Sequence, residues 1–198
     1  MPISYELRPK TASGGIVLDI AKFRFMIPYA GLPFLGTALL ISRFDAMDGI
    51  VLLWCMLLIT FGYIAAVTDL KTKTVSNKLV LAMLAAWAVT AVPLVFYDMT
   101  DAALLLIDSA LGFSAGGGLF LLVYIVSRKG LGGGDVKFMA AAGLYLGLNG
   151  AIPAIFCGTL IAALTGLTLM ILKKIGRKDT MPLTPFLYLG ILITIFFL

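Results

Sequence analysis

The sequence predicts an all-α polytopic membrane protein, and three observations support this prediction. Of its 198 residues, 61% are apolar and only 13% are charged, whereas charged residues make up about 25% of an ordinary soluble domain. Uncharged runs recur along the chain, several of them near the roughly 20 residues that a membrane helix needs. The basic residues between these runs fall on one side of the predicted membrane. We therefore expect about seven transmembrane helices, with six as the alternative.

The first segment, 1–24, carries six charges and no apolar run at its start. We therefore expect a cytoplasmic tail or an interfacial segment there, and no cleavable secretory signal. The remaining residues, 25–198, form one predicted transmembrane domain. Its uncharged runs cover 25–42, 49–68, 79–97, 109–127, 138–172 and 184–198.

Two of these runs do not have the usual spanning length. The fifth holds 35 residues, too many for one upright helix. Asn149-Gly150 and Pro153 interrupt it, so we expect a short helix ending near Leu148 and a second from about Ala151. The last run, 184–198, has 15 residues and is the reason why six spans remain an alternative.

Glycine pairs at four-residue spacing suggest where helices touch. Gly112 and Gly116 form one such pair, and Gly143 and Gly147 form another. Small residues at this spacing let two membrane helices approach closely. We expect close helix contacts at both pairs.

The charges indicate the orientation. With the N-terminus in the cytoplasm, fourteen of the fifteen Lys and Arg residues lie on the cytoplasmic face, and Arg43 alone lies on the other. This agrees with the excess of Lys and Arg in cytoplasmic loops of membrane proteins. We expect a multi-pass protein of the cell membrane with its N-terminus inside. The net charge of +5 is thereby explained without a nucleic-acid partner.

The residue inventory excludes several kinds of chemistry. There is no histidine, so the chain holds no Ser-His or Cys-His nucleophile and no His-rich zinc site. Cys55 and Cys157 each stand alone in an apolar run, without the CxxC spacing of a metal or redox motif. We expect no metal and no cofactor.

Ten carboxylates remain, and most occupy polar segments. Asp98 and Asp101 are predicted to lie in an outer loop, and Asp108 either starts the fourth span or lies in an interfacial turn. Asp69 and Asp135 differ from these. Asp69 ends an uncharged run, Asp135 follows the glycines of GLGGGDVK, and two spans separate them, so both are predicted at the cytoplasmic boundary.

A role as a helix cap explains the position of Asp135 but not that of Asp69. Asp135 suits the start of a helix, where Asp is favoured. Asp69 is predicted at the C-terminal end of a helix, where a negative charge opposes the macrodipole. Two close carboxylates can instead share one proton, so that one acts as a base on water while the other polarises a peptide carbonyl. The glycines before Asp135 would let a substrate backbone approach.

Three motifs carry a family resemblance. Asp69 with its basic loop and Asn77, the segment GGGDVK, and the segment MPLTPFL before Gly190 resemble the type IV prepilin peptidases, which are polytopic aspartic proteases of the GxGD class. The resemblance covers roughly residue 49 to the C-terminus. It implies that Asp69 and Asp135 are the catalytic residues. The site-shaping or substrate-binding residues that it implies are Gly132, Gly133, Gly134, Lys137, Asn77, Pro182 and Pro185.

The implied reaction is removal of a short basic leader from prepilins or pilin-like proteins at the cytoplasmic face. The implied partners are that substrate and the lipid bilayer, and a homo-oligomer is left open. The family's cytoplasmic domain with paired CxxC motifs is missing, so we expect a compact peptidase without N-methyltransferase activity. Ser76 stands where the family usually has proline, and Leu183-Thr184 replaces its usual Phe-Gly.

Other protein functions could involve the same two aspartates. The presenilin branch of GxGD enzymes fits less well, because Asp69 follows Thr68 and not tyrosine. An archaeal preflagellin peptidase is closer to this sequence. A small ion- or proton-coupled transporter using Asp69 and Asp135 is the main alternative from another class. A scaffold subunit, in which both aspartates only cap helices, would tolerate Asn at both positions.

Overall fold

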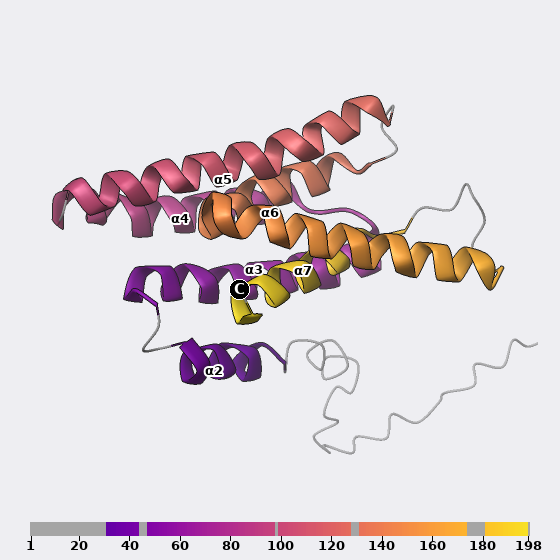
Figure 1. Ribbon diagram of the computed structural model, residues 1–198, viewed down its shortest axis with the longest axis horizontal. Helices are drawn as coiled ribbons and strands as arrows, with labels where there is room; N and C mark the ends of the chain where they lie inside the picture. The colour runs from indigo at the N-terminus through magenta and orange to yellow at the C-terminus, as the bar shows by residue number, and fades with distance from the viewer. Residues whose placement is uncertain (1–30, 44–46, 98, 128–130, 174–180, 198) are drawn as a thin grey trace, which may run out of the picture. The chain divides into compact units, whose positions relative to one another are not determined.

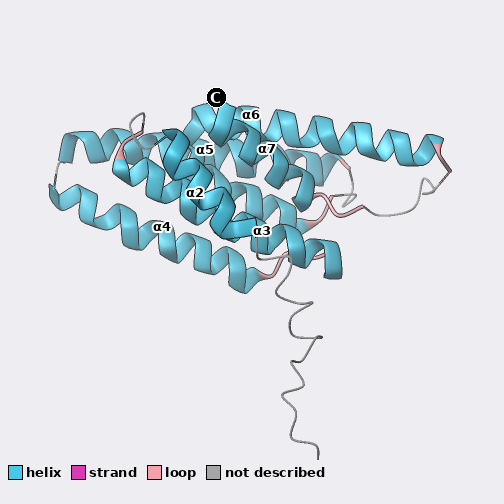
Figure 2. Cartoon of the chain, turned by 90° about the horizontal axis from the view of Figure 1, so that it is seen from below, coloured by secondary structure: helices cyan, strands magenta, loops and turns pink. Residues whose placement is uncertain are grey.

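The computed structural model describes residues 31–43, 47–97, 99–127, 131–173 and 181–197. Over these residues the chain consists of helices joined by loops, with no strand (Figure 2). The prediction of an all-α protein is therefore confirmed. The predicted tail, 1–24, and the start of the first predicted span lie outside the described residues.

The helices follow one another along the described chain as labelled in Figure 1. They are α2 (Gly31–Arg43), α3 (Gly49–Thr72), α4 (Asn77–Tyr97), α5 (Met99–Val126), α6 (Gly133–Ile171) and α7 (Thr184–Phe197). Helices α3 to α6 are each long and apolar enough to cross a membrane, and α7 is a shorter apolar helix. The chain is thus a multi-pass membrane protein. The number of crossings and the side of the N-terminus remain predictions.

The turn between α3 and α4 is fixed by its main chain and by one serine. Lys73 ends α3 with a left-handed φ of 52°, and its N–H donates to the carbonyl oxygen of Asp69 at 2.7 Å. The hydroxyl oxygen of Ser76 accepts the N–H of Lys78 at 3.3 Å. Serine is a favoured N-cap residue. Ser76 therefore starts α4 at Asn77 where the resembling family usually has proline.

Helices α5 and α6 touch along their glycines. A side chain added at Gly112 would overlap the carbonyl oxygen of Gly143, and one added at Gly116 would overlap that of Met139. A side chain at Gly112 would also meet the carbonyl group of Gly147. Only a missing side chain permits such an approach of two backbones. The predicted close contacts at these glycine pairs are confirmed.

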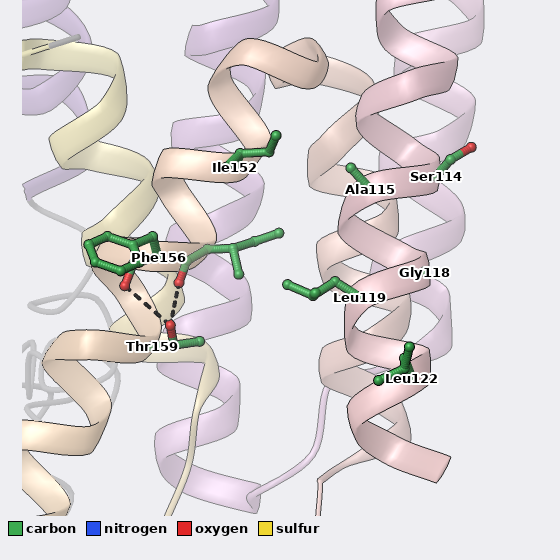
Figure 3. A pocket seen from close by; sticks show the side chains of 9 residues that line it. Ser114, Ala115, Gly118, Leu119, Leu122, Ile152, Phe156 and Thr159 are labelled. Atoms are coloured by element: carbon green, nitrogen blue, oxygen red, sulfur yellow. Dashed lines mark hydrogen bonds between the residues drawn. The ribbon is translucent and has the colours of Figure 1, made fainter. Parts of the chain in front are cut away.

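Helix α6 is interrupted at Gly147, where φ is 65° and ψ is −177°. Before this residue α6 runs antiparallel to α5, as the glycine contacts show. After it the direction reverses: Ile152 lies opposite Ala115, and Thr159 lies further along toward Leu122 (Figure 3). The expectation that the long run divides into two helices is confirmed.

The first helix ends at Gly147, beside the predicted end near Leu148, but the second starts before the predicted Ala151 and the cause of the break differs from the prediction. Asn149, Gly150 and Pro153 all lie within helical turns after the break. A side chain at Gly147 would overlap the carboxylate of Asp108, and its positive φ also favours glycine. Close packing and backbone conformation thus place the break at Gly147, and neither is visible as a turn signal in the sequence.

Helix α5 begins ten residues earlier than the predicted run, and this corrects the placement of two aspartates. Asp101 lies in the first turn of α5 and not in an outer loop. Asp108 lies inside α5, and its Oδ1 accepts the N–H of Leu148 at 3.0 Å. It therefore neither starts the helix nor lies in a turn. Its carboxylate caps the second part of α6, where N–H groups lack partners within the helix.

The core that positions the site is shared by α3, α6 and α7. Leu58 and Ile59 of α3, Phe138 of α6, and Leu187 and Ile191 of α7 are almost fully buried. Helix α7 packs against both α3 and α6. This packing sets the beginning of α7 beside the end of α3 and the beginning of α6.

Candidate active site

The ends of four helices meet at one end of the bundle. Asp69 lies in the last turn of α3, and Asn77 begins α4. Asp135 lies in the first turn of α6, and Thr184 begins α7. Folding thus brings together the three segments from which the sequence-level candidates came.

Both aspartates bind to Thr184. Its main-chain N–H donates to Oδ2 of Asp69 at 3.1 Å, and its hydroxyl donates to Oδ1 of Asp135 at 2.8 Å. Asp69 is 4% exposed, Asp135 is 8% exposed and Thr184 is fully buried. Buried polar groups require such partners. Because one residue binds both carboxylates, the two acids lie at the same place in the fold.

The contact with Thr184 explains why an aspartate occupies the end of α3. At that position its charge faces the unfavourable end of the α3 macrodipole. The main-chain N–H of Thr184, however, brings the positive N-terminal end of α7 to the same carboxylate. Each of these effects has a typical size of about 0.3–1 kcal/mol. The start of α7 therefore offsets the penalty that α3 imposes on Asp69.

The glycines before Asp135 give it space. The N–H of Asp135 donates to the carbonyl oxygen of Gly132 at 3.1 Å, which forms the turn into α6. A Cβ atom added at Gly132 would lie 2.8 Å from Oδ2 of Asp135, and one at Gly134 would lie 3.1 Å from Cβ of Val75. A Cβ atom at Gly133 would meet nothing within 4 Å. A side chain at Gly132 would thus displace the Asp135 carboxylate, one at Gly134 would press on Val75, and one at Gly133 would meet neither.

A cavity of about 210 Å³ opens beside the two carboxylates. It is bounded on one side by the turn between α3 and α4 and on the other by the glycine turn into α6. Its lining residues are Asp69, Lys73, Thr74, Val75, Asn77, Gly132, Gly133, Gly134 and Asp135. Two acids therefore face a space that has a glycine backbone as one wall, and such a wall admits another backbone closely.

Of the remaining predicted residues, Asn77 lines this cavity and Lys137 binds to Asn77. Nζ of Lys137 donates to Oδ1 of Asn77 at 2.9 Å in an exposed position, which links the start of α4 to the first turns of α6. Pro182 and Pro185 do not line the cavity. They precede and follow the Leu183-Thr184 pair, and Pro185 occupies the first turn of α7, where a missing N–H is tolerated.

Thr184 is the residue that sequence reasoning did not identify. With Leu183 it appeared only as a departure from the Phe-Gly of the resembling family. The available signal was a hydroxyl beside prolines at the start of an apolar segment. That signal does not identify the hydrogen-bonding partners of Thr184, because the two acids lie 115 and 49 residues earlier in the chain.

A larger, apolar cavity of about 650 Å³ lies between α5 and the second part of α6 (Figure 3). It has no charged residue in its lining. The Ser114 hydroxyl donates to the carbonyl oxygen of Ala110, and that of Thr159 to the carbonyl oxygens of Ile155 and Phe156. Its polar groups are thus already hydrogen-bonded within their own helices.

Within the described residues, no three Cys, Asp or Glu side chains come together as metal ligands would. Cys55 and Cys157 are both in the reduced thiol form. The groups gathered at the smaller cavity are instead suited to general acid and base chemistry, because a buried carboxyl can donate or accept a proton.

Comparison with known proteins gives one family. The model of the type IV leader peptidase family matches residues 50–167. The prepilin leader peptidase/N-methyltransferase of Bacillus subtilis (strain 168) is 30% identical over 174 residues, which cover 85% of this chain and 65% of that protein. A protein of the same name from Pectobacterium carotovorum subsp. carotovorum is 31% identical over 138 residues, 67% of this chain and 46% of that protein.

The chain spans less than two thirds of the length of these relatives. A third protein of that name, from Xanthomonas campestris pv. campestris, is 32% identical over 68 residues, 34% of this chain and 24% of that protein. No solved structure matches the chain. The family match includes both aspartates, the glycine turn between them and most of the helical bundle. The chain therefore belongs to the type IV leader peptidase family.

Proposed function

We propose that this protein is a membrane aspartic endopeptidase that removes the short basic leader from prepilins or pilin-like proteins at the cytoplasmic face of the cell membrane. The observation that carries this proposal is the pair formed by Asp69 and Asp135. Both are buried, both bind Thr184 and both line one cavity. Family membership supports leader processing as the type of reaction.

In the proposed reaction the two carboxyls carry one proton between them. The ionised member takes a proton from a water molecule as its oxygen attacks the scissile carbonyl carbon. The protonated member gives its proton to the carbonyl oxygen. The tetrahedral intermediate then breaks its carbon–nitrogen bond. The leaving nitrogen takes the proton that the first carboxyl removed from water, and the second carboxylate recovers a proton from a hydroxyl group of the intermediate. The products are the leader with a new carboxyl group and the mature protein with a new amine.

The cavity supports this assignment sterically. A peptide must be extended and close to both acids for water to attack it, and reacting atoms must lie within about 3–3.5 Å. Gly132, Gly133 and Gly134 supply a wall without side chains, so a substrate backbone can reach the acids from this side. Lys137 and Asn77 hold the adjoining helix starts together, which we propose keeps this wall in place.

We further propose that the protein acts as a peptidase without N-methyltransferase activity. The connection between α2 and α3 spans only residues 44–48. The paired CxxC motifs that the resembling larger enzymes carry do not occur in the sequence. Mass spectrometry of the mature substrate tests this: its new N-terminus should be unmethylated after processing by this protein alone.

The test of the peptidase is cleavage of a co-expressed pilin-like substrate, followed as a mobility shift. Wild type is compared with Asp69→Asn and Asp135→Asn, each verified to accumulate in the membrane. The proposal expects cleavage by wild type and none by either variant. Survival of cleavage in either variant would contradict the two-carboxylate mechanism. Ion flux without cleavage would favour the alternative, a transporter that uses the same two acids.

A further inference from the structure

Thr184 makes two hydrogen bonds of different kinds. The bond to Asp69 comes from the main-chain N–H, which every residue except proline could supply. The bond to Asp135 comes from the side-chain hydroxyl, and among residues of similar size only serine and threonine offer one. Position 184 therefore links the two acids only when it carries a hydroxyl.

We infer that Thr184 is a positioning residue that holds Asp69 and Asp135 in a fixed relation for the proposed cleavage. This inference rests on the proposed function. Asp69 lies on α3 and Asp135 lies on α6. Thr184, which is fully buried, is hydrogen-bonded to both. Without the hydroxyl, Asp135 would keep its place on the helix, but its carboxylate would lose the hydrogen bond that ties it to position 184.

The surroundings make this bond important. A hydrogen bond between buried groups is stronger than the same bond in water. Loss of the hydroxyl would leave Oδ1 of Asp135 without this donor, so its carboxylate would be held less firmly relative to Asp69. A misplacement of about 1 Å in an enzyme site can lower the rate about 100-fold. Thr184 would thus affect turnover while touching the acids and not the substrate.

The experiment compares Thr184→Val with Thr184→Ser. Valine has nearly the shape of threonine and keeps the main-chain N–H, but it has no hydroxyl. Serine keeps the hydroxyl. We expect Thr184→Val to lower kcat about 10- to 100-fold with little change in KM, and Thr184→Ser to keep kcat within about 3-fold of wild type. Cleavage is measured in purified, reconstituted enzyme with a pilin-like substrate.

Thr194→Val is the matched control. Thr194 lies on the same helix and is buried, and its hydroxyl donates to the carbonyl oxygen of Gly190 at 3.0 Å. The substitution is chemically identical but leaves the acids untouched, so kcat should not change. If Thr184→Val does not accumulate in membranes, Thr184→Ala removes the hydroxyl with a smaller side chain, and the same loss of kcat is expected.

The outcomes separate this inference from the proposed function. Wild-type cleavage that Asp69→Asn abolishes supports the function, whatever the threonine variants do. With that result in hand, a wild-type kcat in Thr184→Val or Thr184→Ala overturns the inference. Equal losses in Thr184→Ser and Thr184→Val, or in Thr194→Val, would also overturn it, because the hydroxyl at 184 would then not be the cause. If wild type cleaves nothing, both fail together.

Discussion

The N–H of Thr184 donates to the carboxylate of Asp69 at 3.1 Å although 115 residues separate them in the chain. This contact joins the first residue of α7 to the last turn of α3. It places a helix N-terminus against an acid that its own helix disfavours. The same threonine reaches Asp135 through its hydroxyl, so the short C-terminal helix is a component of the candidate active site.

The glycine turn into α6 gives a paired prediction. Gly132→Ala would place a methyl group 2.8 Å from Oδ2 of Asp135, closer than van der Waals contact allows. The carboxylate must then move, and we expect cleavage to fall about 10-fold or more. Gly133→Ala adds the same methyl group where no protein atom lies within 4 Å, so Asp135 stays in place and the rate should fall less than in Gly132→Ala. Initial cleavage rates test this, and equal rates in both variants would contradict it.

The contact between α5 and α6 gives a prediction about stability. In Gly143→Ala the new methyl group would overlap the main chain of Gly112. We expect a loss of about 1–3 kcal/mol or more, as for other overpacked sites. Gly118→Ala meets open space in α5 and should gain about 0.5–1 kcal/mol, because alanine favours helix. Thermal unfolding in detergent compares the two, and changes of the same sign would contradict this prediction.

Asp108 is expected to be structural and to differ from the proposed catalytic pair. Asp108→Asn retains an oxygen that can accept the N–H of Leu148, so stability should hardly change. Asp108→Ala removes that acceptor and should cost about 1 kcal/mol. Both variants should still cleave substrate, in contrast to Asp69→Asn. Unfolding and cleavage measured on the same preparations test this, and loss of cleavage in a well-folded Asp108→Asn variant would refute it.

The proposed acid pair also predicts a pH dependence. Catalysis requires one carboxyl ionised and the other protonated, so the cleavage rate should pass through a maximum. It falls at low pH when both carry protons, and at high pH when neither does. The two apparent pKa values of this pH-rate profile belong to the pair and not to either residue. A rate without any dependence on a carboxyl group would contradict the mechanism.

The sequence by itself determined the membrane class, the helical fold and most of the residues around the cavity. Composition and uncharged runs each depend on many residues at once, so a single unusual residue does not obscure the signal for a membrane helix. The motif positions of Asp69, Asn77, Gly132 and Asp135 lie at helix ends. Their convergence could be anticipated because two spans return the chain to the same face.

Only the tertiary structure decided how helices meet. Gly147 breaks α6 because Asp108, from α5, approaches its backbone, and the turn residues nearby remain helical. Thr184 becomes central because α7 packs against α3 and α6. Periodicity and turn signals describe each segment alone. A hydrogen bond such as that from Thr184 to Asp135 depends on the packing of separate helices, and that packing is a property of the folded chain.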